Sequence, residues 1–293
     1  MDSNYSIYNG DCLAWFKEYK ENNIDLTFLD PPFNQNKEYR YFNDNLSENE
    51  YWQFMLTALK EIYRLSKPGA SIYFMQREKN TQFVLESLKN AGWTFHNLII
   101  WKKKTSAVPC KNKFSKSYQI IAYATKGTKP TTFNKLRISP PLPAHYKYER
   151  KNGLYLTDVW DDIRELTSGY FASEEAIRNK DNSRFHKQQT PIALLLRILL
   201  SSSKRGDLIL DPFAGTGTTL VTAFQLDRKS IGIEIDPKNI ACITSRLNHI
   251  SKGDRINKYL DDYKYTQNLH CLLKETTPVK TEPHQPLFQK TLV

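Results

Sequence analysis

The segment from Leu208 to Asp236 constrains the fold more than any other part of the chain. A short apolar run leads into the turn 211–217, which contains two glycines, and then into a helix-like run at 218–226. A second apolar run, at 230–235, follows directly. A strand, a glycine-rich turn, a helix and a strand in this order predict a βαβ unit.

Strands and helices also alternate in the N-terminal third of the chain. Ser47 and Glu50 form a capping-box pattern at the start of one helix, and Lys67-Pro68-Gly69 ends that helix. The polar segment 34–45 has no period, and we expect a mobile loop there. We expect strands at 24–29, 70–75 and 95–101 and helices at 48–65 and 78–90. The alternation predicts a mostly parallel sheet with helices on both faces.

The alternation stops between residues 102 and 187, where prolines are frequent and one strand is expected, at 118–124. It resumes at Thr190-Pro191, which opens a helix to Ser202 with proline at its first position. Asp236-Pro237 opens a further helix. We therefore divide the chain into an N-terminal α/β part (1–101), an inserted region (102–187), a second α/β part (188–251) and a C-terminal extension (252–293).

The positive charge of the chain is concentrated in this inserted region. The chain has a net charge of +11, and residues 101–151 hold thirteen Lys and Arg but only one Glu. Aromatic residues such as Phe114 and Tyr118 are interleaved with the lysines. This composition is typical of a nucleic-acid surface, although a solvated basic face is the alternative. The residues expected to contact phosphates are Lys102, Lys103, Lys104, Lys111, Lys113 and Lys116.

The glycine-rich turn has the character of a nucleoside site. Gly215 and Gly217 allow a tight turn and close approach of a ligand, beside the free N–H groups of a helix N-terminus. Glu234 ends the next strand, where an acid accepts hydrogen bonds from ribose hydroxyls. Leu220 replaces the third glycine of the dinucleotide pattern, and a bare tight turn is the alternative. The candidate ligand-binding residues here are Asp211, Phe213, Ala214, Gly215, Thr216, Gly217, Thr218, Thr219, Glu234 and Asp236.

A second candidate site follows the strand at 24–29. Asp30, Pro31, Pro32 and Phe33 place a carboxylate, a rigid turn and an aromatic ring at the end of that strand. A fixed set of acceptors suits a planar group that bears an amine. Hydrogen bonds from an NH₂ group to Asp30 and to a proline carbonyl would favour a localised lone pair on the nitrogen, while Phe33 stacks on the ring. An ordinary Asx-capped turn is the alternative.

The two motifs together resemble a known enzyme family. Asp30-Pro31-Pro32-Phe33 with Phe213-Ala214-Gly215-Thr216-Gly217 resembles the DNA amino-methyltransferases that use S-adenosylmethionine. The acidic proline motif comes first, as in the circularly permuted β class of restriction–modification systems. The supporting segments, which are also similar to the family, are Tyr8-Asn9-Gly10-Asp11-Cys12, Asp158-Val159-Trp160, His186 and Gln189-Thr190-Pro191.

This resemblance implies a Rossmann-like α/β methyltransferase fold that is circularly permuted and carries an inserted target recognition domain. In such a fold, residues 1–101 are the catalytic half, 102–187 the recognition region and 188–251 the cofactor-binding half. It implies S-adenosylmethionine as cofactor, with its adenine near Asp11 and its ribose at Glu234. It also implies methylation of adenine in double-stranded DNA after base flipping. Cytosine, RNA and protein glutamine stay open as substrates, and so does a non-catalytic nucleic-acid-binding module.

The remaining expectations concern partners and location. The resemblance allows a cognate restriction endonuclease and a homodimer, and the residues themselves specify neither. The longest apolar run, 192–200, is interrupted by Arg197 and is far shorter than the roughly 20 residues of a membrane span. The N-terminus has no signal pattern and the four cysteines are scattered, so we expect a cytoplasmic protein. The six histidines show no ligand spacing, and we expect no metal.

Overall fold

A computed structural model of the chain describes seven stretches, which include the whole of the predicted α/β core. They are residues 4–37, 41–104, 109–139, 152–166, 174–179, 181–185 and 189–273. His186, Lys147, Arg150, Lys151 and the last twenty residues of the extension lie outside the described residues.

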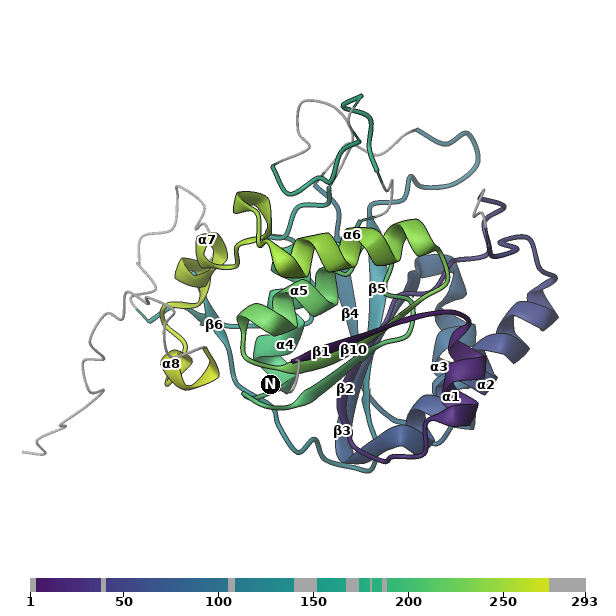
Figure 1. Cartoon of the computed structure of the whole chain (residues 1–293), viewed down its shortest axis with the longest axis horizontal. Helices are drawn as coiled ribbons and strands as arrows, with labels where there is room; N and C mark the ends of the chain where they lie inside the picture. Colours follow the sequence, from purple (N-terminus) through teal and green to yellow (C-terminus); the bar gives the residue numbers. More distant parts are fainter. Residues whose placement is uncertain are drawn as a thin grey trace, which may run out of the picture.

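An eight-stranded mixed sheet forms the centre of the molecule (Figure 1), in the order β1-β10-β9-β2-β3-β5-β4-β8. Neighbouring strands are parallel except for β5, which is antiparallel to both β3 and β4. The mostly parallel sheet expected from the sequence is therefore confirmed. The strands are β1 (Tyr5–Asn9), β2 (Ile24–Leu29), β3 (Ser66–Arg77), β4 (Thr94–Lys102), β5 (Tyr118–Thr125), β8 (Val159–Trp160), β9 (Leu208–Asp211) and β10 (Lys229–Glu234).

Helices cover both faces of this sheet. On one face, α1, α2 and α3 pack on side chains such as Phe74 and Leu210. On the other face, α4 packs on the alternate residues Tyr73 and Ile209. This alternation follows from the two-residue period of a strand, so each core strand is apolar on both sides. The helices of these layers are α1 (Cys12–Glu18), α2 (Glu48–Leu65), α3 (Thr81–Asn90), α4 (Ile192–Ser202), α5 (Thr218–Gln225) and α6 (Pro237–Asn248).

Two predicted helix starts are confirmed by their hydrogen bonds. Ser47 and Glu50 form the capping box at the start of α2. Asp236 caps α6, whose first residue is Pro237. The expected position of Pro191 is wrong by one residue, because it is the N-cap of α4 and the helix begins at Ile192.

Two other boundaries also differ from expectation. Lys67-Pro68-Gly69 does not separate α2 from the next strand, because β3 already begins at Ser66. The pairing of β2 with β3 shifts between Ile24 and Leu26, so the extra residues form an irregularity within the strand. The helix expected at 78–90 begins with a short 3-10 turn, Glu78–Asn80, before α3.

The strand expected at 118–124 is confirmed, but it does not belong to a separate module. β5 lies in the central sheet between β3 and β4, and Tyr73 pairs with Tyr123. β8 adds a further strand from the same region beyond β4. The region 102–187 therefore contributes to the sheet as well as to loops outside it. Its remaining described strands, β6 (Arg137–Ile138) and β7 (Leu154–Tyr155), form a small antiparallel pair of their own.

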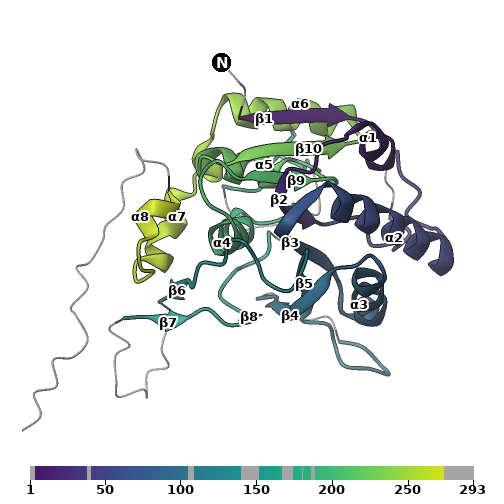
Figure 2. The same ribbon diagram turned by 90° about the horizontal axis from the view of Figure 1, so that it is seen from below.

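The described part of the C-terminal extension packs against α4. It contains α7 (Asn257–Leu260) and α8 (Leu269–Leu272), and Figures 1 and 2 place both at the end of the molecule remote from α2 and α3. Arg197 of α4 is 1% exposed and binds both carboxylate oxygens of Asp162. Its Nε donates to the hydroxyl of Tyr263, at 3.0 Å. This buried group joins α4, the inserted region and the extension.

Among the described residues, no helix has the length and apolar character that crossing a bilayer requires. The same stretches contain no group of three His, Cys, Asp or Glu side chains arranged to hold a metal ion.

Candidate active site

Four parallel strands end at one edge of the sheet and bring the sequence motifs together. Thr27 of β2 pairs with Leu210 of β9, so Asp30 and Phe213 each follow three residues beyond that pair. Asn9 of β1 pairs with Glu234 of β10. The carboxyl ends of parallel strands are where α/β folds bind ligands. Segments from both ends of the chain therefore form one site.

Asp30 lies in a partly buried position that four polar groups surround. Thr190, just before α4, donates a hydrogen bond from its hydroxyl to Asp30 Oδ2, at 3.0 Å. Burial raises the pKa of Asp30 to about 7; the Thr190 hydrogen bond opposes this shift, the negative charge of Asp211 adds to it, and Lys103 and Lys37 oppose it. The Asp30 carboxyl group therefore changes between its neutral and ionised forms near neutral pH.

The proline turn is held by a buried tyrosine. The Tyr51 hydroxyl of α2 donates to the Pro32 carbonyl at 2.7 Å, and it accepts from the Gln76 side chain at 2.9 Å. Pro31 is buried, and Phe33 is 7% exposed within the apolar core that contains α4. The stacking role expected for Phe33 stays a prediction.

The two glycines of the turn have different surroundings. A methyl group at Gly215 would meet only the Phe213 carbonyl oxygen, at 3.9 Å, so this face is open to a ligand. A methyl group at Gly217 would lie 2.7 Å from Ile243 of α6. Gly217 is therefore required for the close packing of α6, and its expected role in ligand approach stays a prediction. Both have positive φ, +52° and +80°, a conformation that favours glycine.

Two carboxylates face the turn from neighbouring strands. Glu234 accepts hydrogen bonds from the N–H groups of Gly215, at 2.7 Å, and Asp236, at 2.8 Å. Asp211 accepts from the N–H of Phe213. Burial raises the pKa of both carboxyl groups, that of Asp211 to about 7. Hydrogen-bond acceptors beside an open glycine fit the ribose and amino groups of a nucleoside cofactor.

Several expected ligand-binding residues have structural roles in this site. Asp11 caps α1 by accepting from the N–H of Ala14, and Asp236 caps α6. Asp11 is also exposed next to the end of β10, because Gly10 donates to the Glu234 carbonyl. The remaining residues expected here, Ala214, Thr216, Thr218 and Thr219, are all buried.

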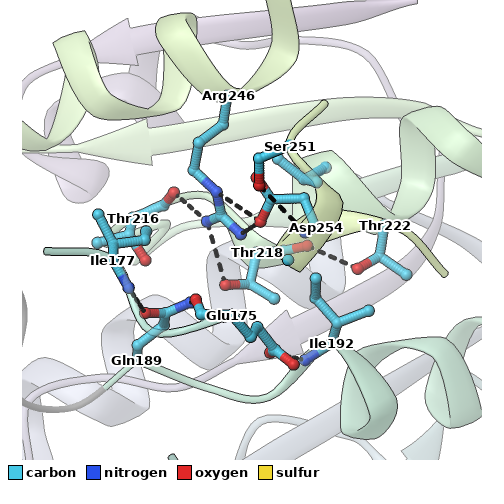
Figure 3. Close-up of polar contacts among 12 residues, drawn as sticks. Glu175, Ile177, Gln189, Ile192, Thr216, Thr218, Thr222, Arg246, Ser251 and Asp254 are labelled. Atoms are coloured by element: carbon cyan, nitrogen blue, oxygen red, sulfur yellow. Dashed lines mark hydrogen bonds and ion pairs between the residues drawn. The ribbon is translucent and has the colours of Figure 1, made fainter. Parts of the chain in front are cut away.

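Sequence reasoning missed Arg246 of α6, which forms hydrogen bonds to the glycine turn. Figure 3 shows its guanidinium between the Thr216 carbonyl, at 2.6 Å, and the carboxylate of Asp254, at 2.7 Å. It also donates to the Thr218 hydroxyl at 3.3 Å. No motif marks this arginine, because its partner Asp254 lies in the C-terminal extension.

The residues before α4 are fixed by a second polar group in Figure 3. Glu175 accepts from the N–H of Ile192, at 2.6 Å, and so stabilises the start of α4. Gln189 accepts from the N–H of Ile177 and donates to the Glu175 carbonyl. These bonds place Thr190 next to Asp30.

The six lysines expected at the nucleic-acid surface divide into three groups. Lys102, Lys104, Lys111 and Lys113 are exposed, on the strand end and loop at the same edge as Asp30. Lys116 is exposed but forms an ion pair with Glu78 at 2.5 Å. Lys103 points inward, with its ammonium 3.2 Å from the centre of the Trp101 ring. Burial lowers the pKa of Lys103 to about 8, opposed by Glu165 and Asp30.

Comparison with known proteins assigns this arrangement to a family. The family model described as DNA methylase matches residues 24–245, which include both motifs and the strands β2, β9 and β10 but not β1. The chain belongs to the DNA methylase family. The methylase is 33% identical over 262 residues to the type II methyltransferase M.BamHI of Bacillus amyloliquefaciens, a match that covers 85% of this chain and 58% of that protein.

Two further comparisons agree with this assignment. The DNA adenine methyltransferase YhdJ of Escherichia coli is 31% identical to the methylase over 261 residues, covering 83% of this chain and 82% of that protein. The crystal structure of the M1.HpyAVI–SAM complex has the same fold, with a TM-score of 0.57 and 21% identity. The structural match covers 83% of this chain and 99% of the M1.HpyAVI chain. The Rossmann-like α/β fold expected from the sequence is confirmed.

Proposed function

We propose that this methylase transfers a methyl group from S-adenosylmethionine to the exocyclic amine of adenine in double-stranded DNA. The observation that carries the proposal is the Asp30 carboxylate, held by Thr190 at the edge of the sheet where the glycine turn and Glu234 also lie. The adenine methyltransferase YhdJ is among the relatives, which supports adenine over cytosine.

Asp30 acts on the amine of the target base. In its ionised form the carboxylate accepts a hydrogen bond from the NH₂ group, and the Pro31 carbonyl is the neighbouring acceptor. The Pro32 carbonyl already accepts from Tyr51, which fixes the turn. These acceptors favour a nitrogen whose lone pair points away from the ring, and holding that geometry lowers the barrier to transfer. Asp30, Pro31, Pro32 and Phe33 are the proposed base-binding residues.

The glycine turn and the carboxylates around it hold the cofactor. S-adenosylmethionine, when bound, supplies a methyl group that is already activated for transfer. Glu234 accepts from the ribose hydroxyls, Gly215 allows the close approach of the ligand, and Asp11 lies near the adenine. Phe213, Asp211 and the N-terminus of α5 complete this proposed pocket.

DNA binding belongs to the region that includes the exposed lysines and the loops of 102–187. A base cannot reach Asp30 while it is stacked in a duplex, so the target adenine is flipped out. Four exposed lysines at the edge that holds Asp30 provide phosphate contacts. We include in the proposal a cytoplasmic location, a place in a restriction–modification system, a cognate endonuclease and a homodimer.

The test is incubation of the purified protein with labelled S-adenosylmethionine and duplex DNA, followed by identification of the modified nucleoside. We expect N6-methyladenine as the product. Detection of N4-methylcytosine would show that the target base is cytosine and not adenine. RNA and protein serve as comparison substrates. Asp30→Ala should abolish transfer while leaving cofactor affinity nearly unchanged, since Asp30 contacts the base. Normal turnover by the folded variant would overturn the proposed chemistry.

A further inference from the structure

Asp44, in the polar segment that follows the proline turn, organises the backbone of that segment. Its side chain is buried, with only 2% of its surface exposed. Its carboxylate accepts hydrogen bonds from the N–H groups of Asn34, at 2.7 Å, and of Gln35 and Lys37, both at 3.0 Å. The described part of the segment is therefore held in place, whereas the sequence predicted a mobile loop.

The backbone around Asp44 adopts conformations that need such support. Asn34 and Asn36 have φ values of +51° and +57°, in the left-handed region. Residues other than glycine adopt this region at an energetic cost, although asparagine tolerates it best. The Asn34 side chain also bonds to both backbone groups of Leu46, at 2.8 Å. The hydrogen bonds of Asp44 and Asn34 thus offset the energetic cost of the positive φ angles at Asn34 and Asn36.

This arrangement begins at the residue after Phe33, the last residue of the proposed base-binding turn. It includes Lys37, whose amide is one of the three groups that Asp44 binds and whose positive charge acts on Asp30. Burial lowers the pKa of Lys37, opposed by Asp44 and Asp30, while Arg77 adds to the shift. Lys37 in turn lowers the pKa of Asp30.

We propose that Asp44 is a positioning residue for base methylation: it fixes the backbone beyond Phe33 and holds Lys37 beside the Asp30 carboxylate. The proposal rests on the proposed function, because it assigns Asp44 to the same site. The charged groups that face Asp30 are Asp211 of β9, Lys103 beyond β4, and Lys37. Those that face Lys37 are Asp44, Asp30 and Arg77 of β3.

The experiment measures single-turnover methylation of duplex DNA between about pH 6 and pH 9, with S-adenosylmethionine affinity measured separately. Asp44→Ala should lower the rate by about a hundredfold, because a small displacement of reacting groups has that effect. Its rate should also begin to rise only at higher pH, because Lys37 no longer favours the ionised Asp30. Cofactor affinity should stay near the wild-type value. Asp44→Asn, which keeps one acceptor oxygen, should restore part of the rate.

Two further variants separate positioning from general stability. Lys37→Met removes the cation without disturbing the three amide bonds, so it should move the pH profile in the same direction with a smaller loss of rate at high pH. Glu50→Ala removes the acid of the α2 capping box, which also binds a backbone N–H. It should lower the melting temperature and leave the pH profile unchanged.

A folded Asp44→Ala protein with a wild-type rate and pH profile would overturn the role of Asp44. If that variant does not fold, an unchanged pH profile for Lys37→Met overturns it instead. Both comparisons require an active wild-type protein. A wild-type protein that methylates no DNA contradicts the proposed function itself, so the two failures are distinct.

Discussion

The Thr190 hydroxyl donates a hydrogen bond to Asp30 across 160 residues of sequence. It joins a residue two positions before α4 to the end of β2, and hence the C-terminal half of the chain to the proline turn. The bond favours the ionised carboxylate, whereas burial favours the neutral acid. The balance leaves the pKa of Asp30 at about 7.

Thr190→Val should move the pH dependence of methylation to higher pH. Ionised Asp30 is a stronger acceptor than the neutral acid, so the rate should rise as the pH increases through the pKa of Asp30. Valine has nearly the shape of threonine but donates no hydrogen bond, so the pKa of Asp30 should rise further. Single-turnover rates should fall below neutral pH and approach wild type near pH 9, about two units above that pKa. An unshifted profile would contradict the assignment of Thr190.

Removal of the exposed lysines should weaken the salt dependence of DNA binding. Each phosphate contact contributes about 0.9 to the slope of log affinity against log salt concentration. Replacing Lys102, Lys104, Lys111 and Lys113 with Gln should therefore reduce the slope by up to about 3.6. Fluorescence titrations at several salt concentrations measure it. An unchanged slope would assign these lysines to a solvated face.

Lys103→Gln is the matched control for that experiment, because Lys103 points inward in the same basic segment. It should leave the salt slope nearly unchanged. It should also raise the pKa of Asp30 by removing a nearby positive charge, so methylation below neutral pH should decrease. A large loss of slope in this variant alone would place Lys103 on a DNA phosphate.

Alanine at the two glycines of the turn should have separable effects. Gly217→Ala places a methyl group 2.7 Å from Ile243 at a φ of +80°, and it should cost about 2 kcal/mol or more of unfolding free energy. Gly215→Ala meets no protein atom closer than 3.9 Å and should cost about 1 kcal/mol, from its positive φ. Cofactor affinity should fall in Gly215→Ala, because the methyl group occupies the open face. Denaturation curves and calorimetric titrations measure the two effects.

Arg197→Met should destabilise the protein by about 3 kcal/mol, since it leaves Asp162 without its buried partner. Adding Asp162→Leu should recover part of that loss, because a buried pair can often be replaced by apolar side chains. Urea denaturation of both variants measures the difference. If the double variant is less stable than Arg197→Met, the Asp162 carboxylate is stabilised by other groups.

The sequence predicts where individual strands begin and end better than it predicts which strands lie side by side in the sheet. Ile24–Leu29 has the predicted bounds, because an apolar run ends at two prolines. Tyr118–Thr125 is recognisable as a strand, yet its place between β3 and β4 depends on pairing with Arg77 and Lys102, which are distant in sequence. Strand propensity contains no information about which strands will become neighbours.

The same distinction applies to the site. Asp30 and the glycine turn can be recognised in the sequence, because each directly follows an apolar strand and lies in or beside a turn. Thr190 and Asp44 are ordinary polar residues until the chain folds. The inward direction of Lys103 does have a sequence signal, because it lies two residues after the buried Trp101, at the position directly after β4. In a run of three lysines, that alternation is easily overlooked.

The position of β1 at the edge of the sheet has a consequence for synthesis of the protein on the ribosome. β1 is made well before β10, and in the described sheet it pairs with β10 alone, at residues 229–234. More than two hundred residues must be translated before that pairing can form. Contacts of such long sequence separation form late, because closing the intervening chain costs entropy first. A nascent chain therefore contains Asp30 well before the sheet edge beside Glu234 is complete.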